Sequence, residues 1–563
     1  MQEETAKILI TDKVAREGVN LLKEQLPQAQ VDERYGLSPA QLKEIIGEYD
    51  ALIVRSETQV TSDLLAAAGK LKIVGRAGVG VDNIDTDAAT RQGIIVVNSP
   101  TGNIMAAAEH TIAMLMSLAR HVPAANASMK ANKWEKSRFL GVEVRGKILG
   151  VVGLGKVGTA VAKRAQGLEM QIIAFDPFVS PDLARKNGIT MLSLEELLQQ
   201  ADFITLHTSL TTGPSGTRGL IGEHELGLMK PGSRIINCAR GGLIDEEALL
   251  KALNENHLAG AALDVFSQEP IRDNETLKQL LAHEHIIATP HLGASTAEAQ
   301  VGVAVDVADQ IVSVLRGGFP RASVNAPLIL PDTLQVLAPY MELVEKMGRL
   351  FTQLQPGPLS KVELSYSGEI ASYDLRPLQA ALIKGLLESV SESHVNMINA
   401  QVLAKEWGVE ITERKSTTPE QFANLVTLHV HNNGYASSFA GKPGTEDEHM
   451  DVLSGTVMDN EARIVRVGRY WTEFVPEGHI IFCHNLDQPG MIGRVGTELG
   501  KVGVNIRHMD VGPSVRSARH HYDPHNKPDT ALMVVSVDAL PPDSALKTIG
   551  QAGDIFGVTL VTL

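Results

Sequence analysis

Short apolar runs alternate with amphipathic segments along the first half of the chain. One series occupies residues 7–98, and a second series of six runs occupies residues 148–289. Strands of a parallel sheet are buried on both faces and read as continuous apolar runs, and their alternation with helical segments is typical of βαβ units. The pattern predicts two α/β domains with parallel sheets, the second of them a complete doubly wound sheet.

The pattern changes in the second half of the chain. A helical segment at residues 297–316 follows the second series directly, and because the first series alone is short for a domain, we expect this helix to pack back onto the first sheet. Residues 317–332 carry Gly and Pro and read as a linker. A mixed α+β region follows, and residues 480–563 have the strand, helix, strand, strand, helix, strand order of a ferredoxin-like domain.

Charge and cysteine content narrow the function class. The 563 residues carry a formal charge of −15, which argues against a nucleic-acid-binding protein because such a protein needs a basic surface. The two cysteines, Cys238 and Cys483, are far apart and fit a reduced compartment. The amino terminus lacks the features of a secretory signal, and no apolar run approaches the length of a membrane span. We therefore expect a multidomain cytoplasmic protein.

A glycine motif opens the second domain. Gly153, Gly155 and Gly158 form a G-x-G-x-x-G pattern between an apolar run and an Ala-rich helical segment. The first glycine permits a tight turn, the second leaves room for a pyrophosphate, and the third lets the helix pack on the strand. Asp176 ends the next apolar run 18 residues after Gly158, which suits a carboxylate that binds the adenosine ribose and repels a 2′-phosphate. The motif predicts a Rossmann-type domain that binds NAD rather than NADP.

Three residues near the ends of apolar runs have the chemistry that hydride transfer requires. Arg240, Glu269 and His291 each follow a different run of the second series. Ligands bind at the carboxyl ends of strands in open α/β sheets, so we expect the three side chains to share one site. A histidine oriented by a carboxylate suits proton transfer, and a guanidinium suits a substrate carboxylate. Each residue alone has an ordinary structural interpretation, and the prediction depends on their joint placement.

Four motifs carry a resemblance to the D-2-hydroxyacid dehydrogenase family over residues 5–328: VVGLGKVGTAVA, NCARGGLIDEEAL, ALDVFSQEP and TPHLGAST. The resemblance implies that Arg240, Glu269 and His291 are the catalytic set, in a cleft between a flavodoxin-like substrate domain and the NAD domain. It also implies cofactor contacts, besides the three glycines and Asp176, at Lys156, Val157, Thr208, Cys238, Ala239, Arg240, Asp264, His291, Leu292, Gly293 and Ala294. Cys238 is then a neighbour of the nicotinamide and not a nucleophile.

Two further segments resemble members of that family that act on a phosphorylated substrate. VRSETQVT and IVGRAGVGVDNID are similar to members that oxidise 3-phosphoglycerate to 3-phosphohydroxypyruvate, the first step of L-serine synthesis. The resemblance implies that Arg55, Ser56, Arg76 and Asn103 bind this substrate. In a chain of charge −15, a trianionic substrate needs such a local group of cations. The alternative for Arg55 is a solvated charge at the rim.

The remaining regions resemble the additional domains of the long members of this family. The implied division is a discontinuous substrate-binding domain at 5–100 and 297–328, an NAD-binding domain at 101–296, an intervening domain at 329–477 and an ACT regulatory domain at 478–563. The resemblance also implies a homotetramer and L-serine as an effector, held near Asn485, Asp487 and Asn505 at a helix N-terminus. An ACT domain that only dimerises is an equally open interpretation.

Two other functions stay open at this point. The chain could be a broader D-2-hydroxyacid or glyoxylate/hydroxypyruvate reductase, or a nucleotide-sensing corepressor that retains the same residues. The acidic charge argues against the corepressor. A loop at residues 516–529 holds His520, His521, Asp523 and His525, but loop histidines without a helix or a Cys pair to frame them are usually solvated, so we expect no metal.

Overall fold

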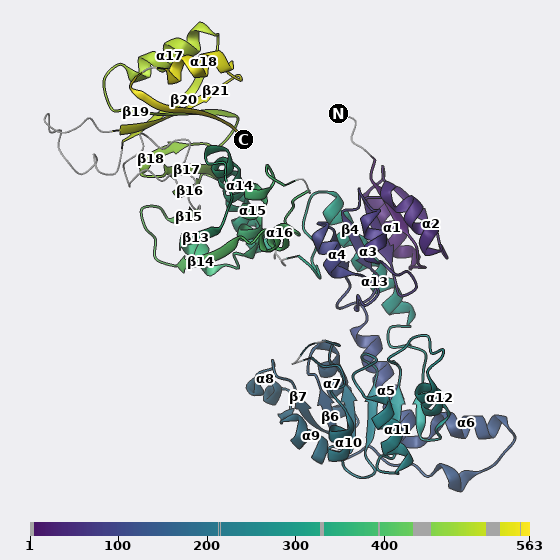
Figure 1. The fold of residues 1–563 in the computed structure, drawn as a ribbon. Coiled ribbons are helices and arrows are strands. Elements are labelled where there is room, and N and C mark those ends of the chain that lie inside the picture. The colour runs from purple at the N-terminus through teal and green to yellow at the C-terminus, as the bar shows by residue number, and fades with distance from the viewer. Residues whose placement is uncertain are drawn as a thin grey trace.

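The computed structural model contains four sheets in chain order (Figure 1). It describes residues 5–211, 213, 216–326, 331–391, 394–431, 452–513, 530–551 and 553–563. The first two sheets are parallel throughout, whereas the last two contain antiparallel pairs. The predicted order of two α/β domains followed by two α+β domains is confirmed.

The first sheet has the strand order β2-β1-β3-β4-β5, which is the flavodoxin-like order. Its strands are β1 (Lys7–Ile10), β2 (Gln30–Glu33), β3 (Ala51–Val54), β4 (Ile73–Arg76) and β5 (Ile95–Asn98). Its connections carry α1 (Arg16–Gln25), α2 (Pro39–Ile45), η1 (Ile46–Glu48), α3 (Ser62–Ala66) and α4 (Thr86–Arg91). The strands are short, and β1, β3 and β4 are largely buried, as expected for a sheet covered on both faces, whereas the edge strand β2 is not.

Helix α13 (Ala297–Leu315) packs against this first sheet although it follows the second in sequence (Figure 1). A Cβ atom on Gly75 of β4 would lie 2.5 Å from a side-chain carbon of Val307, and one on Gly18 of α1 would lie 2.7 Å from the backbone oxygen of Ala304. Such close approach requires glycine at both positions. The proposed discontinuous domain depends on this packing.

The second sheet has the order β12-β11-β10-β9-β6-β7-β8, so the strand order reverses beside β6. Its strands are β6 (Ile148–Val152), β7 (Gln171–Phe175), β8 (Thr190–Met191), β9 (Phe203–Leu206), β10 (Arg234–Asn237), β11 (Gly260–Leu263) and β12 (Ile286–Ala288). Its helices are α5 (Ile104–Arg120), α6 (Val122–Lys130), η2 (Lys136–Phe139), α7 (Lys156–Gly167), α8 (Pro181–Lys186), α9 (Leu194–Gln200), α10 (Glu223–Leu228), α11 (Glu246–Asn254) and α12 (Glu275–Ala282). The sequence predicts six strands here, and the two-residue edge strand β8 is the additional one.

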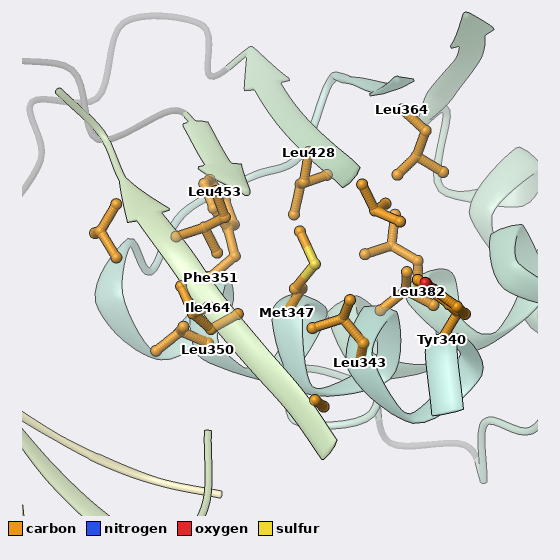
Figure 2. Packing of buried hydrophobic residues seen from close by; sticks show 14 of the residues in the cluster. Tyr340, Leu343, Met347, Leu350, Phe351, Leu364, Leu382, Leu428, Leu453 and Ile464 are labelled. Carbon is orange, nitrogen blue, oxygen red and sulfur yellow. The ribbon is translucent and has the colours of Figure 1, made fainter. Parts of the chain in front are cut away.

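The third sheet, β14-β13-β15-β16-β17-β18, is covered by helices α14 (Pro331–Leu354) and α15 (Arg376–Leu387). Its strands are β13 (Lys361–Gly368), β14 (Glu410–Ser416), β15 (Asn424–His431), β16 (Val452–Met458), β17 (Glu461–Val467) and β18 (Tyr470–Phe474), and η3 (Glu369–Ser372) and α16 (Ala400–Glu406) flank them. Figure 2 shows Met347 of α14 pointing toward Leu428 of the sheet. A Cβ on Gly385 would lie 2.1 Å from the backbone oxygen of Glu345, so the two helices pack with almost no space between their backbones.

The fourth sheet, β20-β21-β19-β22, has the ferredoxin-like order that the sequence predicts. Its elements are β19 (His479–Leu486), α17 (Met491–Lys501), β20 (Ile506–Pro513), β21 (Thr530–Val537), α18 (Asp543–Gly550) and β22 (Ile555–Thr562). Across the described part of the chain, no helix has both the length and the apolar character that a membrane crossing requires.

Candidate active site

A cavity of about 670 Å³ lies where the carboxyl ends of the first two sheets face each other. Arg55 directly follows β3 and Arg76 ends β4, so both come from the first sheet. Arg240, Glu269 and His291 come from loops that follow β10, β11 and β12 of the second. Residues more than two hundred positions apart in sequence therefore line one cavity, on the side of the sheets where α/β proteins bind ligands.

His291 and Glu269 form a direct pair in this cavity. Nδ1 of His291 lies 2.6 Å from one carboxylate oxygen of Glu269, and the other oxygen accepts the backbone N–H of Phe266 at 2.9 Å. The hydrogen bond to Glu269 raises the pKa of His291, although burial opposes the shift. Burial alone would raise the pKa of Glu269, but the hydrogen bonds from His291 and Phe266 outweigh it and lower that pKa. An ionised Glu269 thus holds the proton on Nδ1 and leaves Nε2 to exchange protons.

A buried carboxylate fixes the turn that carries His291. Asp264 is fully buried and accepts the backbone N–H groups of Leu292 at 2.7 Å and Gly293 at 2.8 Å. Its backbone oxygen accepts the N–H of His291 at 2.9 Å. His291 has a φ of +53°, an uncommon conformation that these bonds support. Asp264, predicted as a cofactor contact, therefore also orients the histidine turn, and Ala294 at the end of that turn lines the cavity.

His110 is a residue of this site that sequence reasoning missed. Its Nε2 lies 3.2 Å from the Asp264 carboxylate, and the hydroxyl of Thr289 donates to the same carboxylate at 2.6 Å. Burial alone would raise the pKa of Asp264, but hydrogen bonds from His110 and Thr289 lower it. The signal in the sequence is a lone histidine in an apolar helix, which usually indicates no more than a core position.

Arg240 leaves β10 on a tightly defined turn. Asn237 donates to the backbone oxygen of Arg240 at 2.9 Å, which fixes the turn from within. A Cβ on Gly241 would lie 1.8 Å from the backbone oxygen of Phe266, in the loop after β11. Gly242 has a φ of +81°. The first glycine is therefore required for close approach and the second for its backbone conformation.

The cavity holds three guanidinium groups close together. The Nε atoms of Arg55 and Arg76 are buried and have no hydrogen-bond partner among the described residues. Burial lowers the pKa of Arg76 to about 10, and the positive charges of Arg240 and Arg55 contribute to the shift. A bound anion relieves both the unpaired nitrogens and the mutual repulsion. Ser56 and Asn103 line the same cavity, so all four residues predicted to bind the substrate lie in it.

The glycine motif adopts the turn that its sequence predicts. Gly153 has a φ of +93°, and a Cβ on Gly158 would lie 2.1 Å from the backbone oxygen of Gly153. A Cβ on Gly155 would meet no atom within 4 Å, so this glycine faces open space. Helix α7 begins at Lys156, and Val157 follows in its first turn, whose free N–H groups favour an anion.

The groups around this turn fit a bound NAD. The carboxylate of Asp176 accepts the N–H of Leu154 and the N–H of Phe178, each at 2.8 Å, and each oxygen keeps a lone pair for a ribose hydroxyl. The hydroxyl of Thr208 is buried beside the turn and has no partner among the described residues. An unpaired buried hydroxyl next to an open glycine face is what a polar ligand at this position would satisfy.

Cys238 and Ala239 form the segment between β10 and Arg240. Burial raises the pKa of Cys238 to about 12, and the negative charge of Asp264 adds to the shift. The thiol is therefore protonated at neutral pH, which suits a neighbour of the nicotinamide better than a nucleophile.

The predicted effector residues do not come together within one chain. Asn485 lies beside the start of β21, and Asp487 lies just beyond β19. Asn505 precedes β20, and its N–H donates to the side-chain carboxylate of Asp538, beyond the end of β21, while its backbone oxygen accepts the N–H of Asp538. Six positions of β21 separate the two ends, or about 20 Å of strand. Asn505 therefore lies apart from Asn485 within one chain, because α17 carries the chain back along the sheet before Asn505.

The histidine-rich loop at 516–529 lies outside the described residues. Among the residues that are described, no group of three or more His, Cys, Asp or Glu side chains is arranged to hold a metal ion.

Comparisons with known proteins define the class. Residues 112–293 match the NAD-binding domain of D-isomer specific 2-hydroxyacid dehydrogenases. A D-lactate dehydrogenase from Aquifex aeolicus, solved with NAD and lactic acid, is 27% identical, covers 57% of this chain and 99% of its own, and superposes with a TM-score of 0.51. A glyoxylate reductase from Paecilomyes thermophila is 30% identical with the same coverage and a TM-score of 0.52. The fold and the site therefore define an NAD-binding D-2-hydroxyacid dehydrogenase.

The rest of the chain narrows this class. Residues 336–467 match the D-3-phosphoglycerate dehydrogenase intervening domain, and residues 479–554 match the ACT domain. D-3-phosphoglycerate dehydrogenase of Synechocystis sp. is 44% identical over 560 residues, covering 99% of this chain and 95% of the relative. Those of Methanocaldococcus jannaschii and Bacillus subtilis are 39% and 38% identical and cover 99% of this chain. The chain belongs to the D-3-phosphoglycerate dehydrogenase family, in its long form.

Proposed function

We propose that the protein catalyses the reversible NAD-dependent oxidation of 3-phosphoglycerate to 3-phosphohydroxypyruvate, the first step of L-serine synthesis. The observation that supports this proposal most strongly is the cavity in which Arg55, Arg76 and Arg240 surround a His291–Glu269 pair. A substrate with a carboxylate at one end and a phosphate at the other needs cations at two points. The chain supplies them from two different sheets.

The proposed mechanism assigns one task to each side chain. The Gly153–Gly158 turn, together with Asp176 and Thr208, would hold NAD, whose nicotinamide would accept the hydride. Arg240 binds the substrate carboxylate through its planar fork, which sets the orientation of the hydroxyl-bearing carbon. Nε2 of His291 takes the hydroxyl proton during oxidation and returns it during reduction. Glu269 keeps Nδ1 protonated and stabilises the imidazolium that forms.

Arg55 and Arg76 are proposed to bind the phosphate, together with Ser56 and Asn103. Both guanidinium groups are on the first sheet, opposite the residues that handle the proton. The substrate, with its phosphate on the first sheet and its carboxylate on Arg240, thus joins the two walls of the cleft, which contributes to excluding water from the reacting atoms.

The pH dependence should depend on the Glu269–His291 hydrogen bond. This bond raises the pKa of His291. Oxidation needs the neutral imidazole, so kcat/KM for oxidation should increase as pH rises through that pKa. Reduction needs the protonated imidazole, so kcat/KM for reduction should decrease over the same range. In Glu269→Gln the pKa of His291 should fall, so both limbs should move to lower pH. Steady-state rates across pH in both directions measure this. Limbs that do not move in Glu269→Gln would contradict the assignment of the pair.

A broader 2-hydroxyacid reductase is distinguished by the phosphate site. In Arg55→Ala and Arg76→Ala, KM for 3-phosphohydroxypyruvate should rise about tenfold or more, since a charge-assisted contact to the phosphate is lost. KM for unphosphorylated hydroxypyruvate should change little. Arg91→Ala, which removes an exposed arginine at the far end of the first sheet, is the matched control. Equal effects on both substrates would favour the broader reductase.

We propose that the protein works in the cytoplasm and that it is a homotetramer. We also propose that a projecting segment forms one of the contacts between subunits. Helix α6 and the residues after it extend from the second sheet (Figure 1). Trp134 and Leu140 on this segment are 82% and 86% exposed, and Met129 is 53% exposed. Large apolar side chains gathered on a projecting segment favour burial against another copy of the chain. Light scattering after gel filtration measures the mass directly.

The ACT domain is proposed to bind L-serine as an effector. Its N-terminal helix turn at α17 offers free N–H groups to a carboxylate, and the side-chain oxygen of Asn485 nearby is buried without a partner among the described residues. A ligand that also touches Asn505 would have to bind between two copies of the domain, given the separation along β21. Millimolar serine should therefore lower the rate and give a binding isotherm by calorimetry. A flat response in both would leave the domain with an assembly role only.

A further inference from the structure

Asp82 lines the cavity as well, and the proposed mechanism gives it no task. It lies in the loop between β4 and α4, on the side of the first sheet, and its Oδ2 atom lies 3.4 Å from Nε of Arg240. The same guanidinium also makes a contact within its own turn, because Nη1 of Arg240 donates to the backbone oxygen of Ala239 at 2.8 Å. The guanidinium is therefore held by its own turn and by a carboxylate from the opposite wall of the cavity.

These two contacts leave one edge of the Arg240 guanidinium available for a substrate carboxylate. A guanidinium has five N–H groups, one on Nε and two on each terminal nitrogen. Asp82 faces the Nε side of the guanidinium as an ion-pair partner, and Ala239 accepts one hydrogen of Nη1. The outward hydrogens of Nη1 and Nη2 remain, and two parallel N–H groups of this kind bind a carboxylate in bidentate fashion.

The loop that carries Asp82 is built to reach Arg240. A Cβ on Gly80 would lie 2.3 Å from Nη2 of Arg240 and 2.8 Å from Oδ2 of Asp82, so a larger residue at Gly80 would displace the pair. Asn83, and not Asp82, ties the loop to its surroundings, since its side chain donates to two backbone oxygens at 2.8 and 2.7 Å. Among the described residues, Asp82 forms an ion pair with Arg240. The side chain of Asp82 is 72% exposed. A purely structural role for Asp82 therefore has little support.

We propose that Asp82 is a positioning residue that orients Arg240 across the cleft for the substrate carboxylate. Its negative charge also offsets part of the repulsion between Arg240 and Arg76. This inference rests on the proposed function in one respect: it requires that Arg240 binds a carboxylate of the substrate.

The test is a double-mutant cycle on the full-length protein with Asp82→Ala, Arg240→Lys and the double variant. Asp82→Ala should raise KM for 3-phosphohydroxypyruvate about five- to tenfold and leave KM for NADH unchanged, because only the carboxylate fork is misaligned. Asp82→Asn should recover little of the loss, because the contact is an ion pair and the amide carries no charge. Lysine has no planar fork for Asp82 to orient, so removing Asp82 in the Arg240→Lys background should have little further effect. Asp87→Ala, which removes an exposed carboxylate from the same segment, is the control.

Three results would overturn the proposal. The first is an unchanged KM for 3-phosphohydroxypyruvate in Asp82→Ala. The second is a lower KM in that variant, which would make Asp82 a competitor of the substrate carboxylate. The third is an increase in KM on removing Asp82 that is equally large in the Arg240→Lys background. Repeating the cycle with hydroxypyruvate separates this inference from the proposed function. The coupling between Asp82 and Arg240 concerns the carboxylate, so it should appear with either 2-oxo acid, even if the phosphorylated one is not the preferred substrate.

Discussion

Replacing His291 by asparagine should lower kcat about a thousandfold in both directions while KM for NADH stays within a factor of about two. The reason is that Nε2 of His291 is the proposed proton acceptor and donor, and Glu269 holds it in the required tautomer at 2.6 Å. An asparagine fills a similar volume and can still hydrogen-bond, but it cannot carry the proton. Stopped-flow and steady-state measurement of NADH absorbance gives both constants.

His224→Asn is the matched control for this substitution, because His224 is an exposed histidine on α10 outside the cavity. It should leave both constants unchanged. The assignment of His291 would fail if its asparagine variant kept kcat within about tenfold of the original while remaining folded, because a positioned acid and base contributes more than that.

The second large effect should come from Arg240. In Arg240→Gln, kcat/KM for the 2-oxo acid should fall about a thousandfold, mostly through KM, because a bidentate charged contact is lost in a partly buried cavity. Arg240→Lys should lose somewhat less, since the charge remains but the planar fork does not. KM for NADH should be nearly unaffected in both. Steady-state kinetics with each substrate varied in turn separates these constants.

The arginine assignment has its own distinguishing outcome. A loss in Arg240→Gln that falls on NADH instead of the 2-oxo acid would make Arg240 a cofactor residue. A loss confined to thermal stability would make it a structural one, because its contacts to Ala239 and Asp82 would then be its main role.

The sequence was most informative where a residue type has one physical explanation. The Gly153, Gly155 and Gly158 spacing predicts a turn that leaves one open face, and the structure has that turn. Two glycines after Arg240 predict a close approach of another backbone, which is present at 1.8 Å from the Cβ position of Gly241. Continuous apolar runs predict buried parallel strands, and two such sheets are present.

The sequence was least informative where a role depends on tertiary packing. His110 reaches Asp264 only because α5 crosses the second sheet in one particular rotation, and no spacing within the helix encodes that rotation. The separation of Asn485 from Asn505 depends on strand register in the fourth sheet, which local pattern does not determine. Asp82 lies only six residues after Arg76 in the sequence, yet its partner Arg240 belongs to the second sheet.

The most direct test of the central claim is NADH oxidation by the purified protein with 3-phosphohydroxypyruvate and with hydroxypyruvate. If the guanidinium groups of Arg55 and Arg76 bind a phosphate beside the His291–Glu269 pair, kcat/KM should favour the phosphorylated acid by about a hundredfold or more. Comparable rates with the two acids, or no oxidation of NADH with either, would contradict the account.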